Sequence, residues 1–262
     1  MSARNLSSRF APPRQQGYTL LEILVALFIG IFLLAGLFTI LQNTRRTSSN
    51  QTALAQLQDQ QRMAMSILTD VIQNAGYFDA ATTSSTIAMP AVSSGTWVTG
   101  YAVASGQGVS GADAAAGDTI VARFATNGTD GLINCNGATG AAGTFTNMFF
   151  IKSTTSGGIT TYALYCSTDP TSTAAGIPLI TGVQNMQIYY GVSTVPGATN
   201  VDTYMTAAQV QTASAWANIS SVRVTLSFIN PLFGQAGYTT NNYVYLTRVI
   251  PLQSRTGPTG AI

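Results

Sequence analysis

The chain has 262 residues, of which 46% are hydrophobic and 8% are charged, whereas about 25% of residues are charged in a typical soluble domain. Three of its eleven basic residues precede Gly17, which leaves eight basic and nine acidic side chains beyond it. This near-neutral remainder has no basic patch for broad electrostatic binding of nucleic acid. The sequence has no histidine, which excludes Ser-His-Asp and Cys-His catalytic sites.

The N-terminal part divides into a polar leader and an apolar run. Residues 1–17 are polar and basic, and residues 18–41 carry one charge, at Glu22. A run of this length crosses a hydrocarbon core of about 30 Å as a helix. A cleaved secretory signal peptide is the alternative, but it has a shorter apolar core of roughly 7–15 residues and ends at small residues. No such cleavage site follows Leu41.

Glu22 is the only glutamate in the protein. A charged residue costs about 2.5–3.5 kcal/mol at the centre of a membrane helix, and less near an end. Ionisable groups in membrane segments usually have a partner and mark function. The alternative is an interfacial glutamate that only favours the helix N-terminus through the helix dipole.

The stretch Gly17-Tyr18-Thr19-Leu20-Leu21-Glu22 before an apolar helix resembles the class III signal of type IV prepilins and pseudopilins. The resemblance implies that a membrane prepilin peptidase cuts between Gly17 and Tyr18 and methylates the new terminal amine of Tyr18. It also implies that Glu22, then the fifth residue, neutralises the terminal amine of a neighbouring subunit during assembly. Tyrosine replaces the phenylalanine usual at the first mature position, and the leader is longer than in many major pilins.

The helical pattern continues beyond the apolar run. No proline occurs between Arg14 and Met89, and apolar residues recur at spacings of three and four, at Leu54, Leu57, Ala64, Leu68, Val71, Ile72 and Ala75. This stripe predicts an amphipathic helix, and Gly76 is a natural end. A helix from Thr19 to Ala75 would be roughly 85 Å long. Its first half suits a membrane or filament core, and its second half suits packing on a globular domain; a coiled coil is the alternative for the second half.

The remaining chain predicts a β-rich domain. The expected strands are Thr96–Val103, Asp118–Ala125, Thr144–Ser153, Ile159–Cys166, Val183–Val192, Ser220–Ile229 and Tyr243–Leu252. Apolar and polar residues alternate in these runs, which indicates sheets with one buried face. We expect a hairpin at residues 156–158, one short helix at residues 203–215 and surface loops at 104–117 and 136–144. Long helices do not alternate with the strands, so a parallel α/β sheet is not expected.

Cys135 and Cys166 are the only thiols. One bridge between them would close a loop of about 32 residues, worth roughly 3–4 kcal/mol in the chain-entropy model. Free cytosolic thiols are the alternative, and the spacing excludes a CxxC motif. A disulfide would fit a domain exported to an oxidising compartment.

The resemblance extends into the β-rich part and narrows to the PilW-type minor pilins. The similar stretches are Asp118–Phe124, Asn134–Gly137, Tyr162–Cys166, Leu179–Gly191, and Trp216 with Val222–Leu226. The fold thereby expected is α+β and pilin-like: a long N-terminal helix, whose first half spans the membrane, packed on a C-terminal and mainly antiparallel β domain. The expected divisions are a leader at 1–17, a transmembrane assembly helix at 18–42, its amphipathic continuation at 43–76 and a periplasmic domain at 77–262.

Other candidate sites are weaker. Asn127–Gly131 with Asp118 and Asn134 could form a calcium loop, but the segment lacks the alternating acidic ligands of an EF-hand, and a plain turn is the expectation. The tyrosines at 189, 190, 204, 243 and 245 are expected to pack on strands. Carboxylates and nucleophiles show no catalytic spacing. We therefore expect no enzyme activity, no metal and no cofactor.

The resemblance implies a minor pilin that primes type IV pilus assembly at the tip and supports motility, adhesion or DNA uptake. Its partners would be other minor pilins, the major pilin and prepilin peptidase, with a tip adhesin as a further candidate and no direct nucleic-acid site. It would reside in the bacterial inner membrane with a periplasmic domain and then in the pilus. The alternatives are a minor pseudopilin of a type II secretion system and, more remotely, a membrane-anchored periplasmic binding domain or enzyme.

Overall fold

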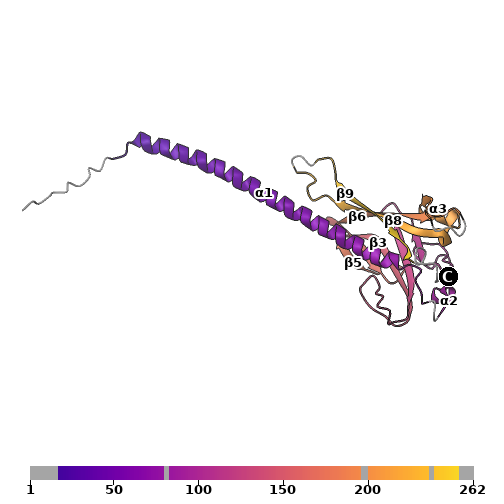
Figure 1. Ribbon diagram of the computed structural model, residues 1–262. Coiled ribbons are helices and arrows are strands. Elements are labelled where there is room, and N and C mark those ends of the chain that lie inside the picture. The colour runs from indigo at the N-terminus through magenta and orange to yellow at the C-terminus, as the bar shows by residue number, and fades with distance from the viewer. Residues whose placement is uncertain (1–16, 80–82, 196–199, 236–238, 254–262) are drawn as a thin grey trace, which may run out of the picture. The chain divides into compact units, whose positions relative to one another are not determined.

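A computed structural model describes residues 17–79, 83–195, 200–235 and 239–253. The chain forms two compact units that divide between Thr52 and Ala53. Helix α1, Leu20–Gln73, begins in the first unit and ends in the second. Its boundaries lie within two residues of the predicted helix. The strands of the second unit and the shorter helices are labelled in Figure 1.

The first unit is an apolar helix whose side chains are exposed. Phe28 and Phe32 are each 74% exposed, and aliphatic residues around the whole circumference are exposed with them. The hydroxyl of Thr39 donates to the Ala35 carbonyl at 3.0 Å, and Thr44 donates to Ile40 in the same way at 2.9 Å. These internal bonds satisfy the two threonine hydroxyls, as an apolar surrounding requires. By length and composition, α1 could cross a membrane.

The second unit buries one face of the last five turns of α1. The buried side chains are Leu57, Ala64, Met65, Leu68, Val71 and Ile72. They follow the predicted stripe, although Leu54 is 36% exposed and Met65 was not part of the prediction. Beyond the helix, Gly76 has a φ of 84°, a conformation that suits glycine at a helix end.

The first sheet is an antiparallel meander of five strands in the order β1-β2-β3-β4-β5. The strands are β1 Val109–Ala112, β2 Thr119–Thr126, β3 Gly143–Ser156, β4 Ile159–Ser167 and β5 Ile177–Thr181. Strands β3 and β4 form the predicted hairpin, closed by the pair Ser156 and Ile159. Gly157 and Gly158 lie between them with φ values of 58° and 79°, which a tight two-residue turn of this kind requires.

The second sheet is antiparallel and has the order β7-β6-β8-β9. Its strands are β6 Val183–Val192, β7 Thr203–Met205, β8 Ile219–Ile229 and β9 Tyr243–Pro251. The core joins residues of both sheets to the buried face of α1, for example Leu68, Phe149 and Val224. The predicted α+β fold, with a long N-terminal helix and antiparallel sheets, is confirmed.

Three local predictions were wrong or incomplete. Residues 96–103 form turns and contribute only a bridge between Val92 and Val103. The predicted loop at 104–117 contains β1, and the predicted helix at 203–215 is split into strand β7 and helix α3, Ala207–Thr212. A side-chain capping box starts α3 at Thr206, which explains why the helix begins later than predicted.

The apolar residues of 96–103 pack without forming a strand. Trp97 and Val103 cluster with Val121, Met148 and Phe150 on the face of the first sheet that lies away from the main core. Strand β2 is therefore buried on both faces along almost its whole length. Helix α2, Ser85–Ala88, lies in the same segment of irregular chain.

Arg123 on β2 fastens this irregular segment. Its side chain is 2% exposed, and its guanidinium donates to the carbonyls of Gln107 at 2.9 Å, Pro90 at 2.7 Å and Ala104 at 3.2 Å. A longer bond of 3.4 Å reaches Met89, and the guanidinium carbon lies 5.5 Å from the Trp97 ring centroid. Burial lowers the pKa of Arg123 to about 10, so the group stays charged at neutral pH.

We predict that Arg123→Met lowers the free energy of unfolding by about 3 kcal/mol or more, because several buried carbonyls lose their donor together. Urea unfolding of the full chain in detergent, followed by tryptophan fluorescence, measures the change. Arg248→Met is the matched control, since Arg248 is exposed, and it should change stability by less than about 0.5 kcal/mol. Equal stability of the two variants would contradict the fastening role of Arg123.

Candidate assembly site at the start of the helix

The predicted signal residues lie at the beginning of α1. Residues 17–19 are not helical, and Thr19 caps the first turn. The Thr19 hydroxyl accepts from the Glu22 amide at 3.3 Å, and the Thr19 carbonyl accepts from the amides of Glu22 and Ile23 at 3.0 and 3.3 Å. Threonine at the cap with glutamate three residues later is the sequence pattern of a capping box. Glu22 therefore occupies a fixed place in the first turn.

The Glu22 carboxylate is exposed and has no hydrogen-bond partner among the described residues. It is the acidic group of the first helical turn, where the partial positive charge of the helix end stabilises a carboxylate by about 0.3–1 kcal/mol. Exposed apolar side chains surround it, such as Leu21 at 70% and Ile23 at 58%. Burial of this helix start in membrane or protein would require a cationic partner for Glu22.

The bond between Gly17 and Tyr18 is open to an approaching enzyme. Both residues are exposed, and Tyr18 is 79% exposed. A Cβ atom added at Gly17 would have no atom within 4 Å. The conformation of the chain therefore does not demand glycine at this position, so any requirement for it must come from a partner.

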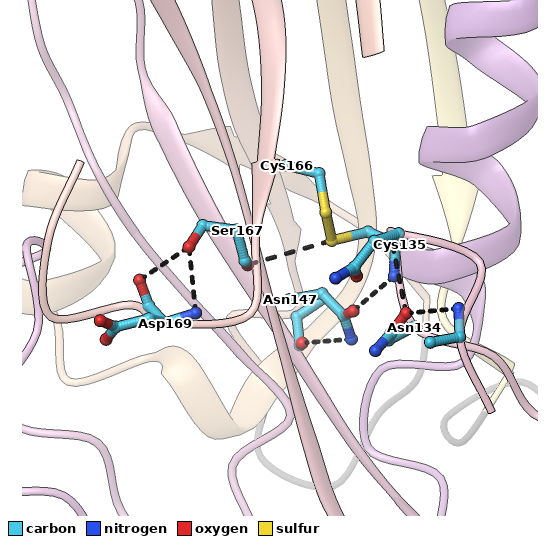
Figure 2. Close-up of a disulfide and its surroundings, with 9 residues drawn as sticks. Asn134, Cys135, Asn147, Cys166, Ser167 and Asp169 are labelled. Carbon is cyan, nitrogen blue, oxygen red and sulfur yellow. Dashed lines mark hydrogen bonds between the residues drawn. A yellow bond between two sulfur atoms is a disulfide. The ribbon is translucent and has the colours of Figure 1, made fainter. Parts of the chain in front are cut away.

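Cys135 and Cys166 form a disulfide in the second unit, with Cα atoms 6.0 Å apart. Figure 2 shows the bridge beside Asn147, whose side-chain carbonyl accepts from the Cys135 amide at 2.8 Å. The bridge attaches the loop before β3 to the end of β4. Next to it, the Asn134 side chain accepts from the Ala138 amide at 2.9 Å and closes the loop on itself.

The carboxylates considered for calcium accept hydrogen bonds from other groups of the chain. Asp130 accepts from the Thr126 hydroxyl at 2.5 Å and from the Asn127 amide at 3.1 Å. Burial is the largest single influence on the pKa of Asp130 and raises it, but the hydrogen bonds from Thr126, Leu132 and Asn127 together outweigh burial and lower the pKa. Asp118 binds other groups, the amides of Ala114 at 3.0 Å and Ile188 at 2.8 Å. The two carboxylates thus act in different places: Asp130 closes its own turn, and Asp118 joins the segment before β2 to strand β6.

The tyrosines expected to pack on strands behave differently from one another. Tyr190 is buried against Trp216, with ring centroids 5.2 Å apart, and burial raises the pKa of its hydroxyl. Tyr189 and Tyr204 instead flank the Arg223 guanidinium, at 4.7 and 4.4 Å from the ring centroids. Tyr245 is 66% exposed. Sequence reasoning missed the Arg223 stack, although the alternation of β8 places this arginine on the face opposite the core.

Comparisons with known proteins agree with this geometry. The family described as type IV pilus-assembly protein W matches residues 148–255, which include β4 to β9. The prokaryotic N-terminal methylation motif matches residues 12–38, which include the cap and the first turns of α1. No curated protein sequence matches significantly.

A solved structure of a type IV-like pilin from Thermus thermophilus matches with 11% sequence identity and a TM-score of 0.35, over 76% of this chain and 96% of that chain. At that score the structural likeness adds nothing to the two family matches. The two family matches cover the helix start and the second half of the β-rich unit, and together they support a type IV pilus minor pilin of PilW type.

Proposed function

We propose that prepilin peptidase processes this chain between Gly17 and Tyr18 and that the mature protein helps to prime type IV pilus assembly at the pilus tip. The observation that carries the proposal is the exposed, unpartnered carboxylate of Glu22 in the first turn of an exposed apolar helix. Glu22 is the fifth residue after the exposed Gly17, and both lie within the matched methylation motif. Motility, adhesion or DNA uptake would be downstream outputs of such a pilus.

Charge pairing supplies the physical reason for the role of Glu22. Cleavage creates a cationic amine at Tyr18, and methylation keeps that charge. An amine and a carboxylate are each unfavourable alone in an apolar filament core, and pairing offsets much of the desolvation penalty. Pairing between neighbouring subunits would also fix their register. The cap at Thr19 supports this role because it holds Glu22 in the first turn.

The arrangement in the membrane follows from two supporting observations. Three arginines precede the apolar run, and Arg45 and Arg46 follow it, so the positive-inside rule favours a cytoplasmic N-terminus only slightly. The disulfide supports an oxidising location for the second unit. We infer an inner-membrane protein with a periplasmic domain that later enters the pilus. Other minor pilins, the major pilin, prepilin peptidase and a tip adhesin are the proposed partners.

The polar groups of the described domain support a structural subunit rather than an enzyme. Asp113 accepts from the amides of Ala207 and Ala208, each at 2.9 Å. Asp202 and Asp169 bind a threonine hydroxyl at 2.7 and 2.6 Å. These carboxylates hold loops and a helix start in place, and each of them already accepts from at least two internal donors.

Gly17→Val should block processing while leaving the protein in the membrane, because the structure has room for the side chain and the peptidase is expected to require glycine. Mass spectrometry of the N-terminus should find a methylated Tyr18 in the wild type. The variant Tyr18→Phe should begin with a methylated phenylalanine. The valine variant should keep residues 1–17. A wild-type mature chain that retains the leader would contradict the processing proposal.

Deleting the gene should strongly reduce surface pili and leave protein secretion intact, because a priming subunit acts before filament growth. Electron microscopy of surface pili and assays of secreted enzymes in the same cultures measure the two outputs, with complementation by the intact gene as control. Normal piliation with failed secretion would instead identify a type II secretion pseudopilin.

A further inference from the structure

A donor-rich pocket lies within the second unit, between the second half of α1 and strand β9. Its volume is about 350 Å³, and its lining includes Gln58, Gln61, Arg62 and Met65 from the helix and Leu246 and Arg248 from the strand. Strand β9 ends the order of its sheet and pairs only with β8 among the described strands. The pocket therefore borders an open edge of the domain.

Three donor side chains of this pocket lack acceptors within the described residues. Arg62 and Arg248 are both exposed, and within the described chain neither has a hydrogen bond, an ion pair or a stacked ring. The side-chain Nε2 of Gln61 is buried and has no hydrogen-bond partner. A buried donor without an acceptor is rare in native proteins and indicates a missing partner. This second observation is independent of the two charges.

No carboxylate lines the pocket to neutralise the two arginines. At about 100° per residue, Asp59 and Asp70 project roughly 110° and roughly 130° away from the pocket-facing side of α1. Met65 is buried and Leu246 is half-buried, so they offer apolar contact beside the charged groups. An apolar floor with guanidinium groups at the rim suits an aspartate or glutamate side chain, whose methylene groups rest on the floor and whose oxygens accept several N–H bonds.

Most of the carboxylates in this chain's own domain already have internal partners and are not available as the occupant. Hydrogen bonds from other groups of the chain already occupy Asp79, Asp113, Asp118, Asp130, Asp169 and Asp202. We propose that the pocket receives an aspartate or glutamate side chain from a different polypeptide of the same assembly. The inference rests on the proposed function in taking that polypeptide to be a neighbouring subunit.

Photo-crosslinking of the full chain tests the proposal. Gln58 lines the pocket and is exposed, so p-benzoylphenylalanine at this position should attach to the occupant in membranes of the producing cells. Mass spectrometry should identify a peptide of another polypeptide with an acidic residue beside the attachment point. Arg62→Glu with Arg248→Glu should reduce the cross-link about tenfold or more, because like charges then face each other.

The decisive step is a charge exchange. Replacing the acidic residue of the partner by lysine should restore the cross-link to the doubly reversed chain, and Lys152→Glu, a charge reversal outside the pocket, should leave the cross-link unchanged. If the doubly reversed chain is less resistant to protease than the wild type, the double variant Arg62→Gln with Arg248→Gln replaces it. This neutral variant should show the same loss of the cross-link, and no rescue is then required.

The proposal is overturned by a cross-link that changes less than about twofold in the arginine variants, by an attached peptide without an acidic residue, or by attachment to a second copy of this chain. Normal pili together with any of these results would contradict the proposed occupant of the pocket and leave the proposed function unaffected. Charge-exchange rescue with a protein that does not enter pili would support the pocket and contradict the proposed function.

Discussion

A single carboxylate at the start of an exposed apolar helix is the constraint on which the rest of this protein depends. A charged Glu22 is costly in an apolar surrounding unless a cation pairs with it. The exposed apolar side chains of the first unit need burial in membrane or protein. The same helix ends as an amphipathic element with one face in the core of the second unit. One continuous element thus carries both the carboxylate proposed to act in assembly and part of the domain core.

The β-rich unit uses its few charges for internal structure. Arg123 binds a segment of irregular chain through backbone carbonyls, and aspartates close turns or cap a helix through backbone amides. Within the described residues, Arg123 and these aspartates form no ion pair at 4 Å or less. The arginines left without carboxylates lie elsewhere: Arg223 is stacked between tyrosines, while Arg62 and Arg248 border the pocket. Some of the few charged side chains therefore stabilise the domain, and the two arginines of the pocket are proposed to bind another polypeptide.

Sequence periodicity predicted those elements that local patterns determine. Strand β6 has the predicted boundaries, and the hairpin at residues 156–158 and the helix end near Gly76 are where turn chemistry predicted them. The failures lie where tertiary contacts override the pattern. Trp97 and Val103 looked like strand residues because they are apolar, yet their burial comes from covering β2. Glu22 was identifiable from its isolation in the sequence, whereas the approach of Arg62 to Arg248 depends on a packing between α1 and β9 that no local signal encodes.

The most direct measurement of the central claim is the amount of this subunit in sheared pili when Glu22 is replaced. Glu22→Ala should leave the membrane-bound amount unchanged but reduce the amount in pili about tenfold or more, because the terminal amine of a neighbour then lacks its partner. Asp59→Ala, which removes an exposed carboxylate of the same helix, should enter pili normally. Equal amounts of wild-type and Glu22→Ala protein in pili would contradict the assembly role of this carboxylate.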